Sequence, residues 1–155
     1  MSAPSLFLGD EAWPYCWLLE ISERKLGVHA YDGWCMQSHG QVLTIDSGLT
    51  CVHLLPVLEL GVQDFLEFLV TAELRFPQYA ASIRKFPTKS LLREAFNTSG
   101  AGYWQTKALD WLENDPAMQQ SLKAELEAFT LNKLMPQGSR QTAKRMIRNL
   151  SAVSV

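Results

Sequence analysis

The chain has 155 residues, of which 47% are hydrophobic and 19% are charged. This length is enough to bury a hydrophobic core, and the composition is that of an ordinary globular protein, which argues against wholesale disorder. The formal net charge is −2 and the isoelectric point is about 5.9, which argues against a nucleic-acid-binding protein with a basic domain.

The small net charge hides an uneven distribution. Residues 1–74 carry ten acidic and two basic side chains, a net charge of −8. Residues 75–155 carry six acidic and twelve basic side chains, a net charge of +6. Asymmetry of this kind can indicate a charged binding partner. The alternative is that the two halves attract each other within one fold, and charge alone does not separate these readings.

The number of cysteines and the lack of an apolar segment as long as a signal peptide or a membrane span point to a cytoplasmic protein. Cys16, Cys35 and Cys51 are too few, and odd in number, for a disulfide framework, and they suit a reducing compartment. The N-terminus lacks the basic region and apolar run of a signal peptide. No apolar stretch approaches the roughly 18 residues of a membrane span. We therefore expect a soluble protein with no membrane partner.

Residues 14–46 are predicted to be rich in β-structure. The segment "YCWLLEIS" is a short apolar run bounded by charge, and "QVLTID" follows a turn signal. Between them, Asp32-Gly33 suits a type I′ hairpin turn that joins "GVHAY" to "WCMQS". These segments predict a small antiparallel meander.

A helix is the alternative for residues 11–26. Asp10 would then be its N-cap, and Gly27 would lie just beyond its end. We favour strands, because a single hairpin needs further strands to form a stable sheet.

A two-residue loop fixes the register of the hairpin. It places Tyr31 opposite Trp34 and His29 opposite Met36, with all four side chains on one side of the ribbon. The aromatic pair Tyr31 and Trp34 would either cover the sheet against the helices or contact a partner.

The same register argues against a metal site. His29 and Cys35 would lie on opposite faces and could not share one ion. Cys35 and His39 share a face, but four strand residues span about 13 Å, too far for ligands that lie about 2.0–2.3 Å from one zinc. Cys51 and His53 have no second pair at a matching spacing. We therefore predict no metal and no cofactor.

Residues 50–152 are predicted to form an array of about five to six helices. Val62, Phe65, Leu66 and Leu69 recur at i, i+3, i+4 and i+7, the spacing of one helix face.

Further apolar stripes follow in "TKSLLREAF", "YWQTKALDWLEN" and the last segment. Asp115-Pro116 reads as a helix N-terminus, and Ser139 is predicted to cap the last helix. The predicted fold is α+β, an N-terminal antiparallel β-meander followed by this helical array, in a single domain spanning residues 1–155.

No catalytic site is predicted. The chain has no nucleophile elbow, phosphate-binding loop, dinucleotide-binding glycine motif or zinc-protease motif. Acids on neighbouring helices could do acid–base chemistry, but at this spacing they more often form a solvated face. They are Glu113, Asp115, Glu125 and Glu127. The histidines His29, His39 and His53 are recognised as bases only by geometry.

The last helix carries four basic side chains, Arg140, Lys144, Arg145 and Arg148. A basic helix can track phosphates, but it also complements its own dipole and an acidic half of the same chain. Because the chain as a whole is acidic, we do not expect nucleic acid as the partner.

The run "GYWQTKALDWLEND", followed by a helix and then "SRQTAKRMIRNL", resembles the C-terminal part of small bacterial immunity proteins. The resemblance covers residues 88–150 and consists of helix-packing residues. Proteins of that kind protect a cell against toxins exchanged between competing bacteria, and many of those toxins are nucleases with basic clefts. The resemblance implies binding to a cognate toxin protein and no chemistry of its own.

Resemblance and charge together predict a cytoplasmic immunity protein that binds a toxin domain and masks its active site. An acidic inhibitor would be steered to a basic cleft. The alternative is a regulatory or structural interaction module with another host partner. The candidate partner-binding residues are Asp32, Asp46, Glu59, Asp64, Glu67 and Glu73, with Tyr31 and Trp34 as aromatic anchors.

Overall fold

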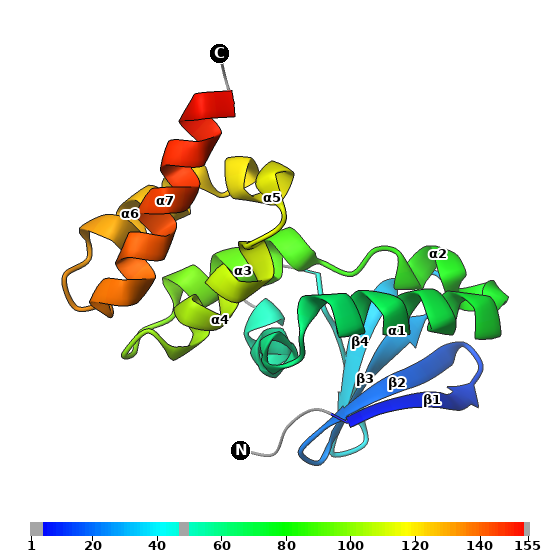
Figure 1. The fold of residues 1–155 in the computed structure, drawn as a ribbon. Helices are drawn as coiled ribbons and strands as arrows, with labels where there is room; N and C mark the ends of the chain where they lie inside the picture. Colours follow the sequence, from blue (N-terminus) through cyan, green and yellow to red (C-terminus); the bar gives the residue numbers. More distant parts are fainter. Residues whose placement is uncertain (1–4, 47–49, 154–155) are drawn as a thin grey trace. The chain divides into compact units, whose positions relative to one another are not determined.

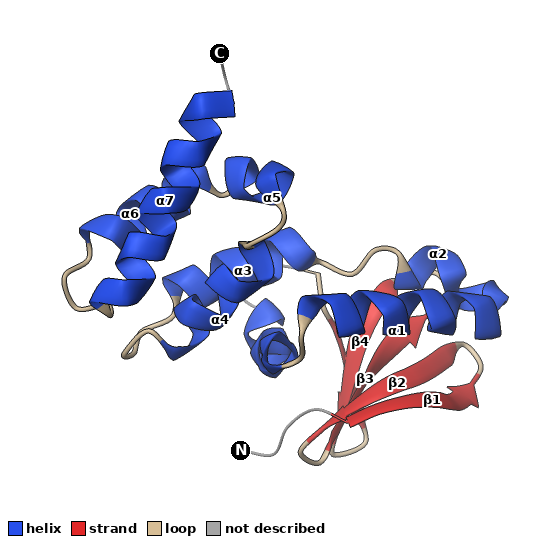
Figure 2. Cartoon of the chain, in the orientation of Figure 1, coloured by secondary structure: helices blue, strands red, loops and turns tan. Residues whose placement is uncertain are grey.

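The structure is a computed structural model that describes residues 5–46 and 50–153. The chain divides into two compact units, Met1–Pro87 and Thr88–Val155, and each is described by itself. The first unit contains every strand of the described residues, and the second is helical (Figure 2). The predicted α+β class, a meander followed by helices, is confirmed. The assignment of the whole chain to one domain stays a prediction.

The first unit begins with a five-stranded antiparallel sheet (Figure 1). Its strands are β1 (Ser5–Ala12), β2 (Tyr15–Ile21), β3 (Arg24–His29), β4 (Gly33–Ser38) and β5 (Gln41–Thr44). Each strand pairs with its neighbours in the chain, which is the order of a simple meander. The alternative helix over residues 11–26 is excluded, because that stretch lies in the first three strands. The sequence did not predict β1.

The hairpin between β3 and β4 has a different register from the predicted one. Its Cα partners are His29–Gly33, Val28–Trp34, Gly27–Cys35, Leu26–Met36 and Lys25–Gln37. The loop is therefore Ala30–Asp32, and the predicted two-residue loop is wrong. Gly33 adopts a φ of 88°, the left-handed conformation that follows a three-residue loop.

The observed register changes which side chains share a face. Trp34 lies on the face of Leu26, Val28 and Met36, all of them buried. His29 lies on the other face together with Cys35, so the predicted grouping of His29 with Trp34 is wrong, as is its separation from Cys35. Among the residues that the structure describes, no group of three His, Cys, Asp or Glu side chains is placed to hold a metal ion.

The described part of the first unit also contains four helices, and α1 and α2 lie against one face of the sheet (Figure 1). They are the 3₁₀ helices η1 (Thr50–Glu59) and η2 (Pro77–Tyr79) and the α-helices α1 (Val62–Arg75) and α2 (Ala80–Ile83). The ring of Trp34 meets that of Phe86 with centroids 5.0 Å apart, and Phe86 meets Phe65 of α1 at 4.8 Å. The indole nitrogen of Trp34 donates a hydrogen bond to the carbonyl of Ile83 at 3.2 Å. These contacts join the sheet to the helices that cover it.

Helix α1 confirms the helical spacing of its apolar residues, but not all of these residues are buried. Phe65, Leu69 and Ala72 are buried, whereas Leu66 is exposed. The helix carries apolar side chains both toward and away from the sheet.

Strands β2 and β3 approach each other closely at Gly27. The pairing shifts between Trp17 and Leu19, which leaves Leu18 in a bulge. A Cβ atom on Gly27 would lie 2.1 Å from the carbonyl oxygen of Cys16 and 2.7 Å from the Cα of Trp17. Both are backbone atoms, so the strands could accept a side chain here only by moving apart.

The second unit contains five helices in its described residues. They are α3 (Thr88–Asn97), α4 (Tyr103–Leu112), α5 (Pro116–Ser121), α6 (Lys123–Leu131) and α7 (Gln137–Val153). The predicted cap at Asp115 is confirmed, since its carboxylate accepts from the amide of Met118 at 3.1 Å. The predicted cap at Ser139 is wrong, because α7 begins two residues earlier and the Ser139 hydroxyl instead lies 2.9 Å from that of Thr106.

Buried apolar side chains line the helices of the second unit at helical spacing. They include Leu91, Leu92, Ala95, Ala108, Leu109, Leu112, Leu122, Leu126, Phe129, Ala143, Met146 and Leu150. In the described ranges, no helix of either unit has the length and apolar character needed to cross a bilayer.

We predict that Gly27→Ala lowers the free energy of unfolding by about 3 kcal/mol or more, because the new methyl group displaces backbone. Gly138→Ala is the matched control, since nothing lies within 4 Å of its Cβ position in α7. There alanine should raise stability by roughly 0.5–1 kcal/mol. Urea denaturation measures both, and equal effects would contradict the close approach of β2 to β3.

Candidate functional site

Two turns of the first unit meet at one end of the sheet. One is Trp13-Pro14, between β1 and β2, where the peptide bond is cis. The other is the loop Ala30–Asp32, between β3 and β4. The amide of Ala30 donates to the carbonyl of Pro14 at 2.8 Å, so the two turns are held side by side.

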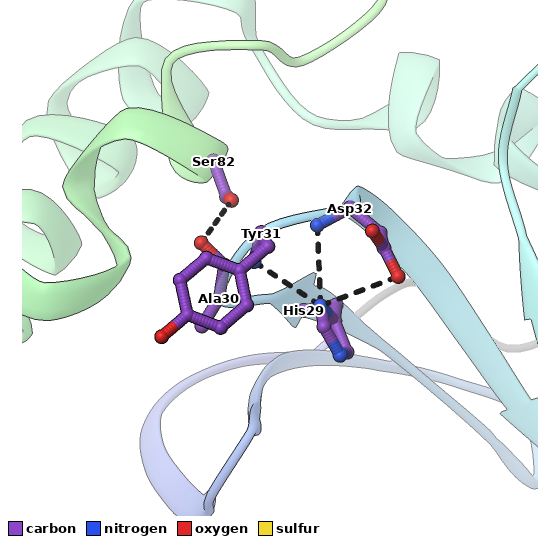
Figure 3. Close-up of polar contacts among 5 residues, drawn as sticks. All are labelled: His29, Ala30, Tyr31, Asp32 and Ser82. Atoms are coloured by element: carbon purple, nitrogen blue, oxygen red, sulfur yellow. Dashed lines mark hydrogen bonds and ion pairs between the residues drawn. The ribbon is translucent and has the colours of Figure 1, made fainter.

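Side chains of the covering helices fasten both turns. The hydroxyl of Ser82, in α2, donates to the carbonyl of Ala30 at 3.0 Å (Figure 3). The hydroxyl of Tyr79, at the end of η2, donates to the carbonyl of Tyr15 at 3.2 Å. Ser82 and Tyr79 are buried, so these bonds are protected from competition with water.

His29 organises the loop that follows it. Its Nδ1 atom accepts hydrogen bonds from the amides of Tyr31 and Asp32, each at 3.1 Å (Figure 3). An Nδ1 that accepts two bonds presents its lone pair, so we assign the proton of the ring to Nε2. The carboxylate of Asp32 lies 3.5 Å from the same Nδ1, and with this tautomer it is a neighbour rather than a hydrogen-bond partner.

The two turns present a pair of exposed aromatic rings. Trp13 is 57% exposed and Tyr31 is 73% exposed. Their ring centroids lie 6.1 Å apart at an interplanar angle of 90°, an edge-to-face contact. Large aromatic side chains that remain exposed next to each other are the type of group that dominates binding at protein interfaces.

Further rings connect this pair to the interior. Trp13 lies 5.6 Å from the buried ring of Tyr79, and Tyr31 lies 6.0 Å from His29. His29 in turn lies 5.2 Å from Tyr15, which stacks on Trp17 at 5.4 Å. We call the residues Trp13, Tyr15, His29, Tyr31 and Asp32 the aromatic end of the sheet.

One acidic side chain belongs to the aromatic end and another lies on β1, the strand that leads into Trp13. Asp32 is exposed within the loop, and Glu11 is exposed at the end of β1. Burial raises the pKa of the Tyr79 hydroxyl, and the negative charge of Glu11 raises it further. Burial also raises the pKa of the Cys35 thiol to about 12, with a further contribution from Asp32. Glu11 and Asp32 therefore both act on buried groups at this end of the sheet.

The thiols of the sheet are not activated. The pKa of Cys16 is raised to about 12 by burial, then by Glu11 and Asp10. Cys16, Cys35 and Cys51 are all buried. A nucleophilic cysteine requires a lowered pKa and access to solvent, so Cys16 and Cys35 do not have the environment of a catalytic thiol.

The structure separates the residues predicted to contact a partner. Tyr31 and Asp32 lie together at the aromatic end. Asp64 and Glu67 lie exposed on α1. Trp34 is 2% exposed and belongs to the core, because its ring and its indole N–H are both engaged by the covering helices, so it is not the exposed anchor that was predicted.

The other three acids that were predicted to contact a partner lie elsewhere in the first unit. Glu73 pairs with Arg84, and this contact links α1 to the end of α2. Asp46 is exposed after β5, where its amide donates to the hydroxyl of Thr50 at 3.1 Å. Glu59 is half-buried at the end of η1.

Trp13 was not predicted as a site residue. Its signal in the sequence is the Trp-Pro dipeptide between two apolar runs, which marks a turn. That turn could be recognised only together with β1, and the sequence did not predict this strand.

The acids considered for catalysis have structural partners in the second unit. Glu113 accepts from Arg145 at 2.6 Å, and Glu125 accepts from Arg93 at 2.9 Å. Asp115 caps α5. Glu113 and Glu125 therefore pair with arginines of other helices, and Asp115 caps its own helix.

The basic side chains of α7 are also partly engaged. Arg145 pairs with Glu113, and Arg140 donates to the carbonyl of Met135 at 3.2 Å. Lys144 and Arg148 line an open groove together with Glu127. An acid within the groove reduces its attraction for phosphate, which does not favour nucleic acid as a ligand there.

No family model, curated protein or solved structure matched this chain.

We predict that His29→Ala lowers the free energy of unfolding by about 1 kcal/mol, because the amides of Tyr31 and Asp32 lose their common acceptor. His29→Asn should cost less, since an asparagine side chain can accept from amides two and three residues later. Both variants lose the ring, so their difference reports the acceptor. Hydrogen exchange at the two amides checks the prediction, and equal protection in both variants would contradict it.

We also predict that Cys16 and Cys35 of the folded protein are alkylated at pH 8 at least roughly 10³-fold more slowly than in urea, because a pKa raised from 9.0 to about 12 leaves little thiolate. Mass spectrometry of the labelled peptides measures each site separately. Rapid native labelling of either residue would show that its thiol is not held as described.

Proposed function

We propose that this chain is a cytoplasmic protein-binding inhibitor, an immunity protein that neutralises a cognate bacterial toxin domain by covering its active site. The observation that carries the proposal is the exposed pair of Trp13 and Tyr31 on the aromatic end. An exposed pair of large rings costs free energy in water and gains it when a partner covers the rings.

The way in which the pair is held supports a binding role. The Ala30–Pro14 and Ser82–Ala30 hydrogen bonds fix the turns on which the two rings stand. A fixed pair loses little conformational freedom when it is covered, so more of the contact energy is available as affinity. Tyr31 and Trp13 also sit on turns, where binding residues concentrate on rigid scaffolds.

The charge of the first unit supports a basic partner. Residues 1–87 contain ten acidic and five basic side chains, a net charge of −5. Such a surface would attract a basic cleft over long range and speed association. A nuclease toxin, whose cleft must bind phosphates, has this property, and the resemblance of residues 88–150 to immunity proteins points to the same class.

The proposed action requires no chemistry by this chain. The rings would enter the cleft of the toxin while Asp32 and Glu11 take the place of the substrate's negative charges. Occupation of the cleft then excludes the substrate.

The test is a capture experiment with the tagged protein in lysate of the organism that carries the gene, washed at low and at high salt. We expect one stoichiometric partner, loosened by salt. The gene of that partner should stop growth when expressed alone, and co-expression of this chain should restore growth. A partner that is harmless when expressed alone would overturn the immunity function.

Substitutions of the exposed aromatic residues test whether the aromatic end is the surface that binds the partner. Trp13→Ala and Tyr31→Ala should each weaken binding of the captured partner by roughly 30-fold, the effect of losing a dominant interface residue. Tyr103→Ala is the matched control, because Tyr103 is also an exposed tyrosine but lies on α4 in the second unit. Equal affinity of all three variants and the wild type would show that the aromatic end is not the binding surface.

A further inference from the structure

The second unit contains a hollow that the proposed function leaves without a role. Its lining comes from α3, α4, α6 and the segments that follow α3 and α6, and its volume is about 320 Å³. That volume lies at the lower end of the range of ligand pockets in proteins. At about 30 Å³ for each non-hydrogen atom, the share of a water molecule in the liquid, the hollow can hold a compound of about ten such atoms.

Part of the lining is aromatic and apolar. Phe96 of α3 and Phe129 of α6 meet with their ring centroids 5.9 Å apart at an interplanar angle of 66°. Met135 and the methyl groups of Ala124 and Ala128 complete this part of the lining. Aromatic and sulfur-containing side chains pack favourably against flat aromatic rings. The apolar lining therefore favours a ligand with an aromatic body.

Gln105 provides a hydrogen-bond acceptor in the polar part of the lining. The residue is 3% exposed, and its Nε2 atom donates to the carbonyl of Thr98 at 2.9 Å, which fixes the orientation of the amide. Within the described ranges, Oε1 of Gln105 has no hydrogen-bond partner, yet no buried side-chain oxygen or nitrogen is left unsatisfied. The small exposed area of Gln105 therefore includes Oε1, and the side chain lines the hollow. An open acceptor on an otherwise buried side chain favours a ligand that donates a hydrogen bond.

Two further polar side chains of the lining are held in place by other residues. Oε1 of Glu125 accepts from Nε of Arg93 at 2.9 Å, so its charge is compensated, and the carboxylate keeps further lone pairs as acceptors. Oδ1 of Asn132 accepts from the amide of Leu134 at 3.1 Å, which leaves the NH₂ group of Asn132 as a donor. The lining thus offers acceptors and a donor around an apolar floor, with its carboxylate already paired.

We propose that the hollow binds an aromatic amine, a flat heterocycle of about ten non-hydrogen atoms whose N–H group donates to Oε1 of Gln105. Its ring packs against Phe96 and Phe129. A second N–H group donates to the carboxylate of Glu125, and a ring nitrogen accepts from Asn132. Aromatic amines are uncharged at neutral pH, which suits a lining whose carboxylate is already paired with Arg93. Nucleobases and other amino-substituted heterocycles share this chemistry.

The small size of the hollow sets the expected affinity. For a ligand of about ten non-hydrogen atoms, we expect a dissociation constant on the order of 100 μM. The proposal does not depend on the proposed function, because the hollow belongs to the second unit and the aromatic end belongs to the first.

Isothermal titration calorimetry of the full chain with matched probes tests the chemistry. Quinoline and 3-aminoquinoline share one ring system, but quinoline has no N–H donor, so the amine should bind about tenfold more tightly through the buried acceptor. Adenine is the third probe and distinguishes the two sources of the ligand. Tighter binding of adenine than of the aminoquinoline would assign the site to nucleobases, and weaker binding would assign it to other aromatic amines.

Substitutions test whether the amine binds in the hollow. Gln105→Met keeps the size of the side chain but removes the acceptor, so it should weaken amine binding about tenfold and leave quinoline binding unchanged. Ala128→Leu fills the hollow from an exposed position and should abolish binding of both compounds. Ala117→Leu is the matched control, since Ala117 is an exposed alanine of α5 outside the lining, and it should leave both affinities unchanged. Circular dichroism confirms that each variant is folded.

A wild type that binds none of the three compounds at millimolar concentration overturns the proposal, because the hollow then holds only water. Equal affinities for quinoline and the aminoquinoline also overturn it, since the acceptor on Gln105 would then make no contact with the ligand. Amine binding that Ala128→Leu leaves intact overturns it as well, because the ligand would then lie elsewhere. Loss of amine binding with unchanged capture of the toxin would leave the proposed function untouched.

Discussion

The first unit depends on the burial of Trp34. Its ring fills the space between β4 and the helices, where it meets Phe86, and its indole N–H must find an acceptor once water is excluded. The carbonyl of Ile83 provides that acceptor at the end of α2. This one bond fixes α2 against the sheet, and Ser82, the preceding residue, is thereby brought to the carbonyl of Ala30. The exposed rings at the aromatic end are therefore held by the same contacts that build the core.

The fold class could be read from the sequence, but the register could not be read from the turn alone. Asp32-Gly33 is a strong local signal for a two-residue loop. The competing requirement is that Leu26, Val28, Trp34 and Met36 share one buried face, which only the three-residue loop allows. The sequence does contain this information, because apolar residues alternate along the chain on both sides of the turn. β1 lacked a comparable pattern, because its pairing with β2 is interrupted between Leu6 and Asp10.

The candidate site could be predicted only in part, because exposure is decided by tertiary contacts. Tyr31 and Trp34 are three residues apart and equally suited to be anchors, yet one is exposed and the other is in the core. The face that each takes follows from the register, which the turn signal gave incorrectly. On α1, Leu66 fits the helical period of the buried face, and only the position of the sheet shows that it lies outside. A pattern of apolar residues therefore predicts the helix better than it predicts the buried side.

The separation of charge in the sequence persists in the structure of each unit. Lys25 pairs with Asp10 and Arg84 with Glu73 in the first unit, and Arg93 pairs with Glu125 and Arg145 with Glu113 in the second. Each ion pair neutralises one acidic and one basic side chain, so the first unit keeps more acidic than basic charges. At Lys25 the hydrogen bond to Asp10, and then the negative charge of Asp10, raises the pKa of the amine. The acids at the aromatic end, Asp32 and Glu11, have no such cation among these pairs. In the proposed function, these two acids would face the basic surface of the partner and contribute to electrostatic steering.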